Sequence, residues 1–190
     1  MRENVSTGNP GLIDTIDCAV GAASVSEITS RIADGLQSLV GRGEIRLPAS
    51  LTRVTPGSYA RRLFHRCPRT GYTVVVMTWG AGQRTGLHDH AGIWCVECVY
   101  KGRIEVTSYS VRGGDPEEGL VLFEREEVVQ AGVGEAGHLI PPFEYHKIAN
   151  PHDVPAVTVH VYGGEMTHCH VFTPVEGGYK REFKELGYTD

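Results

Sequence analysis

The sequence lacks any apolar run close to the roughly 20 residues that a membrane-spanning helix needs, so we expect no membrane association. It also lacks a basic excess: 18 Lys and Arg stand against 23 Asp and Glu, which gives a formal net charge of -5. A chain with this balance has no electrostatic feature that would attract nucleic acid or an anionic lipid surface. Neither is therefore an expected partner.

Cysteine is scarce, and its count of five is odd, which argues against a disulfide scaffold in a chain of this size. Residues 1–20 lack the basic start and apolar core of a secretory signal. Both absences favour a cytoplasmic protein. The chain has 190 residues, of which 41% are hydrophobic, and this is enough to bury the core of one domain.

Helical periodicity is confined to the first third of the chain. Residues 24–39 carry apolar side chains three and four positions apart, and Ser24 and Glu27 form a capping-box pattern at their start. A weaker helical pattern covers residues 58–65, after a Thr-Pro-Gly turn. We therefore expect a small helical N-terminal lobe over residues 1–65.

Short β-rich runs separated by Gly and Pro fill the rest of the chain. Their spacing is typical of an antiparallel sandwich or barrel. We expect a mainly β fold in which residues 66–190 form a barrel that packs with the helical lobe as one structural domain. The predicted strands cover residues 72–79, 94–100, 103–109, 120–125, 143–148, 156–162 and 170–172.

Two segments of the β-rich part carry histidines at spacings that suit a metal site. His88 and His90 are two positions apart, so on a strand they point to the same face. His146, from a distant strand, could supply a third nitrogen. Three imidazoles leave coordination positions open, which is typical of catalytic metals. The ligands alone suit iron, zinc, nickel or copper. The flanking residues of the two segments are Gly82, Gly102, Pro141 and Asn150.

These two segments resemble the paired signatures of the cupin superfamily, whose fold is an antiparallel β-barrel, the double-stranded β-helix. A typical cupin has a glutamate four or five positions after the second histidine, but here Cys95 holds the fifth position. A three-histidine site with this cysteine resembles the thiol dioxygenases, and cysteine dioxygenase in particular. The similarity runs from Tyr59 to His170 and includes the stretches HDHAGIWCVECVYKG and HKIANPHDVPAVTVHVY.

The resemblance implies an enzyme with one iron(II) per chain, held by His88, His90 and His146, and with no organic cofactor. Such an enzyme adds both atoms of O₂ to a thiol sulfur and produces a sulfinic acid. Tyr162 and Cys95 match the pair that forms a thioether crosslink in animal members of the family. The resemblance also implies that His160 orients the tyrosine hydroxyl.

The substrate side of the site is implied in the same way. Tyr59 and Arg61 match the tyrosine and arginine that bind the substrate carboxylate, and Cys169 matches a cysteine near the pocket. Relatives that oxidise 3-mercaptopropionate usually carry glutamine at the arginine position, so Arg61 favours cysteine. Because Arg62 follows directly, the register of this match stays open.

The predicted reaction is the oxidation of L-cysteine by O₂ to cysteine sulfinate. The alternatives are a dioxygenase of another small thiol, such as 3-mercaptopropionate, or a specialised-metabolism enzyme that takes the cysteine sulfur to a different oxidised product. The divergent tail at residues 175–190 keeps both open. Outside enzymes, the alternative is a ligand-binding cupin. The sequence is compatible with a monomer or a homodimer.

Overall fold

The computed structural model describes residues 9–115, 119–142 and 144–190. The N-terminal part of this range holds three helices, α1 (Pro10–Ala19), α2 (Val25–Gly41) and α3 (Ala49–Thr52). None of the helices within the described ranges is long and apolar enough to cross a membrane. The strands are β1 (Ala60–Arg66), β2 (Thr73–Trp79), β3 (Leu87–His88), β4 (Cys95–Lys101), β5 (Arg103–Gly114), β6 (Leu120–Gly132), β7 (Ala136–Leu139), β8 (His146–Ala149), β9 (Ala156–Tyr162), β10 (His168–Val175) and β11 (Gly178–Glu185).

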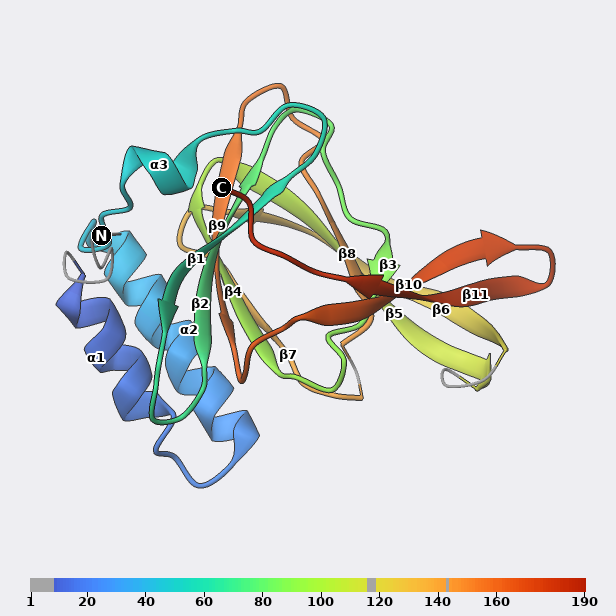
Figure 1. Cartoon of the computed structure of the whole chain (residues 1–190), viewed down its shortest axis with the longest axis horizontal. Helices are drawn as coiled ribbons and strands as arrows, with labels where there is room; N and C mark the ends of the chain where they lie inside the picture. Colours follow the sequence, from blue (N-terminus) through green and yellow to red (C-terminus); the bar gives the residue numbers. More distant parts are fainter. Residues whose placement is uncertain (1–8, 116–118, 143) are drawn as a thin grey trace.

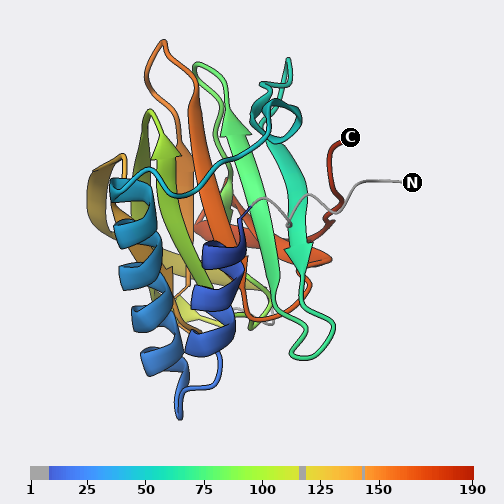
Figure 2. The ribbon, with the colours of Figure 1, turned by 90° about the vertical axis from the view of Figure 1, so that its left-hand side faces the viewer.

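Helix α2 begins at the predicted capping box. The Ser24 side chain accepts a hydrogen bond of 3.2 Å from the backbone N–H of Glu27, which satisfies one of the free donors of the first turn. Helix α1, which the periodicity did not predict, lies beside α2. Figure 2 shows both helices against the outer face of a sheet, where Ile16, Ile32 and Leu36 are fully buried.

The helix predicted over residues 58–65 is wrong. Most of this segment lies in β1, which pairs antiparallel with β2 from Ala60 opposite Thr78 to Arg66 opposite Thr73. Its local pattern is ambiguous, and the edge of β2 has backbone groups that need hydrogen-bonding partners. Pairing with a strand formed later in the chain therefore overrides the helical preference.

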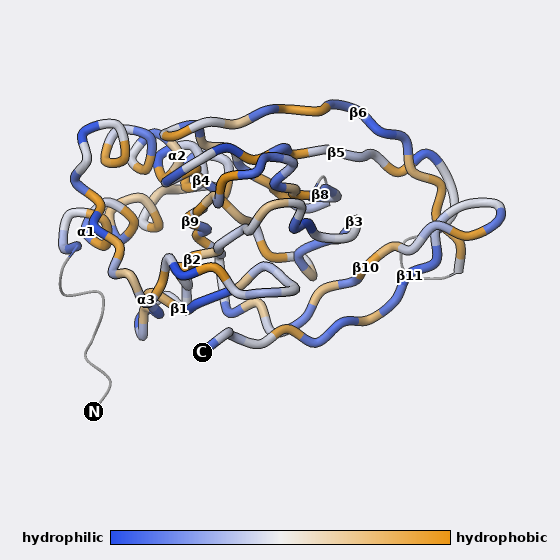
Figure 3. Tube along the Cα trace, turned by 90° about the horizontal axis from the view of Figure 1, so that it is seen from above, coloured by the Kyte–Doolittle hydropathy of each residue, from blue (hydrophilic) through white to orange (hydrophobic). Residues whose placement is uncertain are grey.

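Two facing sheets make up the β fold. The first has the order β1-β2-β9-β4-β7, and the second has the order β10-β11-β6-β5-β8-β3, with β3 pairing back onto β10. Figure 1 shows the hairpins β5–β6 and β10–β11 projecting away from the helices, and Figure 3 shows β3 and β8 between them. The arrangement confirms the expected mainly β double-stranded β-helix of the cupins with a small helical N-terminal lobe.

Seven of the strands correspond to predicted β-rich runs: β2, β4, β5, β6, β8, β9 and β10. The short strands β3 and β7 and the C-terminal strand β11 were not predicted, because none of them has a clear apolar alternation. The run predicted from residue 143 becomes β8, which begins at His146. Phe143 itself lies outside the described residues.

Strand β9 positions the functional side chains, because it lies in the middle of the first sheet and is buried along its whole length. Successive side chains on a strand point to opposite faces. Val157, Val159 and Val161 therefore pack against the helices on the outer face. The intervening positions, which include His160 and Tyr162, face the interior between the two sheets.

Candidate active site

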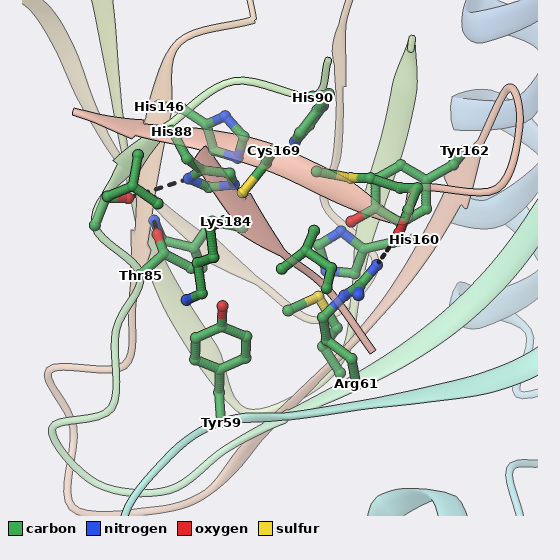
Figure 4. A pocket seen from close by; sticks show the side chains of 16 residues that line it. Tyr59, Arg61, Thr85, His88, His90, His146, His160, Tyr162, Cys169 and Lys184 are labelled. Atoms are coloured by element: carbon green, nitrogen blue, oxygen red, sulfur yellow. Dashed lines mark hydrogen bonds between the residues drawn. The ribbon is translucent and has the colours of Figure 1, made fainter. Parts of the chain in front are cut away.

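Three histidines meet on the inner side of the fold. His88, the last residue of β3, is the register partner of His146 at the start of β8. His90 lies two residues beyond the end of β3. The ring centroids of His88 and His146 are 4.4 Å apart, and those of His90 and His146 are 4.9 Å apart. One ring nitrogen from each of the three lies within 4.8 Å of the others, and Figure 4 shows the rings gathered at one end of a pocket.

Backbone carbonyls orient two of these rings. The Nδ1–H of His88 donates to the Gly86 carbonyl at 3.1 Å, and the Nδ1–H of His146 donates to the Glu144 carbonyl at 2.8 Å. This arrangement fixes the tautomer and leaves each Nε2 lone pair available, as in histidines that bind metals. In the described part of the chain, His146 Nε2 and His90 Nδ1 are buried without a hydrogen-bond partner. The donor set therefore fits a metal cation.

The surroundings keep the three imidazoles neutral. Burial lowers the pKa of His146 to about 4. Burial, followed by the other imidazoles, lowers the pKa of His88 and His90 well below the usual value. Charging a buried imidazole costs free energy because solvation is lost. Neutral nitrogens are the form that binds a metal.

Cys95 and Tyr162 lie side by side on neighbouring strands. They are direct register partners in the pairing of β4 with β9, and both are almost completely buried. Burial raises the pKa of the Cys95 thiol, and burial together with Cys95 raises the pKa of the Tyr162 hydroxyl. Cys95 and Tyr162 are 67 positions apart in the sequence but adjacent in space, and both groups are protonated near neutral pH.

His160 lies beside both residues, on the inner face of β9. Its Nε2 is 2.7 Å from Thr158 Oγ1, and its ring stacks beside the Tyr162 ring with centroids 6.0 Å apart. Its Nδ1 lies 3.9 Å from Cys95 Sγ. Burial lowers the pKa of His160 to about 3, so this ring is also neutral.

Arg61 reaches the pocket from β1. Its guanidinium donates to the carbonyls of Gly187 at 3.1 Å and Met166 at 3.4 Å, and it lies over the Tyr188 ring. The residue is 6% exposed and makes no ion pair with any described acidic residue. A buried cation without an anion is costly, so this group suits an anionic ligand.

The side chain of the neighbouring Arg62 points away from the pocket. Arg62 donates to the Arg53 carbonyl at 2.8 Å and to Thr78 Oγ1 at 3.2 Å, away from the pocket. The structure therefore resolves the register that the sequence left open, since Arg61 lines the pocket and Arg62 does not.

The remaining matched residues also line this pocket, which encloses about 460 Å³, its open mouth included. Tyr59 stacks on Trp79 with ring centroids 4.9 Å apart, and Figure 4 shows its hydroxyl pointing inward. Cys169, buried on β10, reaches the pocket as well, and burial raises the pKa of its thiol to about 11. The structure thus brings all nine sequence-matched residues to one interior region.

Three charged residues that lie near the site were not predicted from the sequence. Lys184, on β11, lines the pocket mouth (Figure 4) and is the register partner of Cys169. Asp89 accepts from the His170 backbone N–H at 2.8 Å and contacts its Nδ1 at 2.9 Å, which ties β10 to the histidine segment. Glu97 faces His160 from β4. Only Glu97 had a sequence signal, an acid within the apolar run CVECVY.

A double-stranded β-helix with three neutral histidines at an inner pocket defines a cupin with a candidate mononuclear metal centre. Residues 49–174 match the family described as cysteine dioxygenase type I. The chain belongs to this family of thiol dioxygenases.

Individual relatives are distant. The chain is 22% identical over 102 residues to cysteine dioxygenase type 1 of Homo sapiens and, equally, of Bos taurus, a match that covers 53% of this chain and 49% of each relative. The chain thus spans about half the length of the curated relatives it matches. Among solved structures, a double-stranded β-helix protein from Klebsiella pneumoniae is similar at 20% identity and a TM-score of 0.49, covering 64% of this chain and 91% of that one.

Proposed function

We propose that the protein is an iron(II)-dependent dioxygenase that oxidises L-cysteine with O₂ to cysteine sulfinate. One observation supports this above the others: the same pocket holds three neutral histidines, two buried and one half-buried, and a buried arginine that has no acidic partner among the described residues. A small thiol that also carries a carboxylate matches both halves of the pocket.

His88, His90 and His146 would hold the iron. Their free nitrogens face one point, and two of the rings are already oriented by backbone carbonyls. Bound there, iron(II) would supply a site for the substrate thiolate and for O₂. The five cysteines of the chain are free thiols, which suits the reducing cytoplasm as the compartment.

Arg61 and Tyr59 would hold the substrate carboxylate. A guanidinium makes two parallel, charge-assisted hydrogen bonds to a carboxylate, and the carbonyls of Gly187 and Met166 hold the Arg61 side chain in place. Fixing the carboxylate at one end of the pocket directs the thiol of a small substrate toward the histidines. Such positioning removes much of the entropic barrier to reaction.

Tyr162 would act next to the reacting sulfur. Its ring lies edge-on to the ring of His90, with centroids 5.6 Å apart, and burial keeps its hydroxyl protonated. The hydroxyl can therefore donate a hydrogen bond to an oxygen atom in the pocket. His160 and Cys95, which flank Tyr162, would fix its orientation.

The direct test is O₂ uptake by iron(II)-loaded protein with cysteine, with the product mass read after reaction in ¹⁸O₂. We expect a product that carries two labelled oxygen atoms on cysteine. An inert cysteine together with a reactive 3-mercaptopropionate would contradict the substrate assignment. A labelled product other than the sulfinate would identify a specialised variant of the reaction, and no O₂ uptake with any thiol would favour a ligand-binding cupin.

The proposed ligands can be tested without turnover. The substitution His146→Ala should abolish stoichiometric iron binding, measured by metal analysis after anaerobic loading and desalting. His138→Ala is the matched control, because His138 is an exposed histidine on β7. Equal iron content in the two variants would contradict the ligand assignment.

A further inference from the structure

A carboxylic acid lies inside the fold beside the candidate site. Glu97 is on β4 between Cys95 and Val99, two residues of the inner apolar cluster, and it is 6% exposed. Its register partner on β9 is His160. Glu97 Oε2 lies 3.5 Å from His160 Nδ1 and has no aligned hydrogen-bond partner within the described ranges. Burying a carboxyl group without hydrogen-bond partners costs free energy, so the presence of Glu97 at this position beside His160 needs an explanation.

The opposite edge of the His160 ring has an ordered partner. Trp79 Nε1–H, which can only donate, reaches Thr158 Oγ1 at 2.9 Å. The Thr158 hydroxyl lies 2.7 Å from His160 Nε2. After accepting from Trp79 it still has its own hydrogen, which it can donate to this nitrogen. With Nε2 as the acceptor, the neutral ring of His160 carries its proton on Nδ1. That N–H faces Glu97.

The Glu97–His160 pair also lies between two cavities. His160 lines the pocket of the candidate site. Glu97 lines a second pocket of about 820 Å³, its open mouth included, which Gln37 of α2 also lines. The titratable groups around Glu97 are Cys95, His160 and Tyr162 on the inner side and Cys98 and Glu135 in the second pocket. Strands β5 and β6 present apolar side chains there.

We propose that Glu97 is a positioning residue that holds His160 in the Nδ1–H tautomer, and that the pair carries protons from the candidate site to the second pocket. The catalytic part of this inference rests on the proposed function. When Cys95 bonds to Tyr162, the thiol S–H and a ring C–H break and a C–S bond forms. The two electrons pass to O₂, which takes up the ring proton and one proton from solvent and leaves as H₂O₂, while the thiol proton leaves through His160 and Glu97. Glu97 accepts the Nδ1 proton of His160, and the emptied nitrogen takes the thiol proton.

The tautomer can be measured on the metal-free protein, with no turnover. ¹⁵N chemical shifts of the imidazole nitrogens, with His160→Gln for assignment, should show a neutral His160 protonated at Nδ1. Glu97→Leu should shift the proton toward Nε2, whereas Glu97→Gln, whose amide oxygen still accepts, should keep it on Nδ1. A wild-type His160 protonated at Nε2 would overturn the proposal even if neither variant folds.

The proton transfer can be measured as the rate at which the Cys95–Tyr162 bond forms during turnover, followed by the loss of two hydrogens from the linked peptides. We expect this rate to fall about tenfold in Glu97→Leu and less in Glu97→Gln, with KM for cysteine unchanged because Arg61 is untouched. Glu127→Gln, on the exposed part of β6, is the control.

The outcomes separate the two proposals. If the wild-type protein consumes no O₂, the proposed function fails and the tautomer alone decides the role of Glu97. If the wild-type protein turns over and Glu97→Leu forms the bond at the wild-type rate, the proton-transfer inference is wrong and the proposed function stands.

Discussion

Arg61 and Arg62 are neighbours on β1, yet their guanidinium groups lie on opposite sides of the sheet. Arg61 lines the pocket, and Arg62 donates hydrogen bonds to the Arg53 carbonyl and to Thr78 behind it. Alternation of side chains along a strand separates the two. One position of register therefore decides which arginine is available to a substrate.

Arg61→Gln should raise KM for cysteine by about 10- to 100-fold, because a charged hydrogen bond contributes roughly 1.5–3 kcal/mol. Steady-state O₂ uptake measures this effect. Arg62→Gln is the matched control: it should lower the midpoint of urea unfolding and leave KM within about twofold. A KM effect in Arg62→Gln of the same size would contradict the placement of the two side chains.

The register of Cys95 opposite Tyr162 leads to a second expectation at this scale. After turnover with cysteine, the iron-loaded protein should contain a thioether between these residues, detected as one linked peptide that has lost two hydrogens. Cys95→Ser should remove the linked peptide and keep the fold, since serine is nearly isosteric. Detection of a link from Cys98 would be incompatible with the structure, because Cys98 packs on the outer face of β4.

At the scale of elements, the turn between β4 and β5 lies close against the start of β9. Gly102 has a φ of +77°, and a Cβ there would lie 2.7 Å from the Pro155 carbonyl oxygen. Pro155 directly precedes β9, the strand of His160 and Tyr162. Glycine at this motif position therefore allows two site-bearing strands to approach each other.

Gly102→Ala should destabilise the protein by about 2–4 kcal/mol, from left-handed backbone strain plus the clash. Gly82→Ala is the matched control, since Gly82 has a φ of +72° but open space around the missing Cβ. This variant should lose only about 1–2 kcal/mol. Urea unfolding monitored by tryptophan fluorescence gives both values, and equal losses would show that the contact with Pro155 does not matter.

At the scale of the whole molecule, the buried neutral histidines make the free energy of unfolding depend on pH. Burial lowers the pKa of His146 to about 4 and that of His160 to about 3, whereas an unfolded chain titrates near 6.5. Between these values the unfolded chain binds more protons than the native state. Stability is therefore complete above pH 6.5 and is lost as the pH falls.

Unfolding free energies of the metal-free protein should decrease from pH 7 to pH 5, by up to about 1.4 kcal/mol per pH unit for each such histidine. Glu97 opposes this trend, because burial raises its pKa to about 7 and the native state binds its proton first. The unfolding free energy of Glu97→Gln should therefore decrease more steeply with falling pH than that of the wild-type protein. Urea titrations at pH 7.5, 6 and 5 test both statements, and a stability that rises toward pH 5 would contradict them.

Much of the fold and of the candidate site was readable from local patterns. The capping box at Ser24, the alternation along β9 and the spacing of the histidines all depend on residues a few positions apart. The chemistry of a side chain and its place in a strand or helix repeat are local properties. They are therefore present in the sequence, and they were sufficient to indicate the cupin fold and the candidate ligands.

Only the tertiary structure decided what depends on pairing between distant segments. Most of the predicted helix at residues 58–65 became part of β1, Arg61 rather than Arg62 was directed to the pocket, and Glu97 was placed opposite His160. The register of β1 on β2 and of β4 on β9 sets each of these outcomes. Register follows from packing both faces of a sheet at once, a condition that no short stretch of sequence contains.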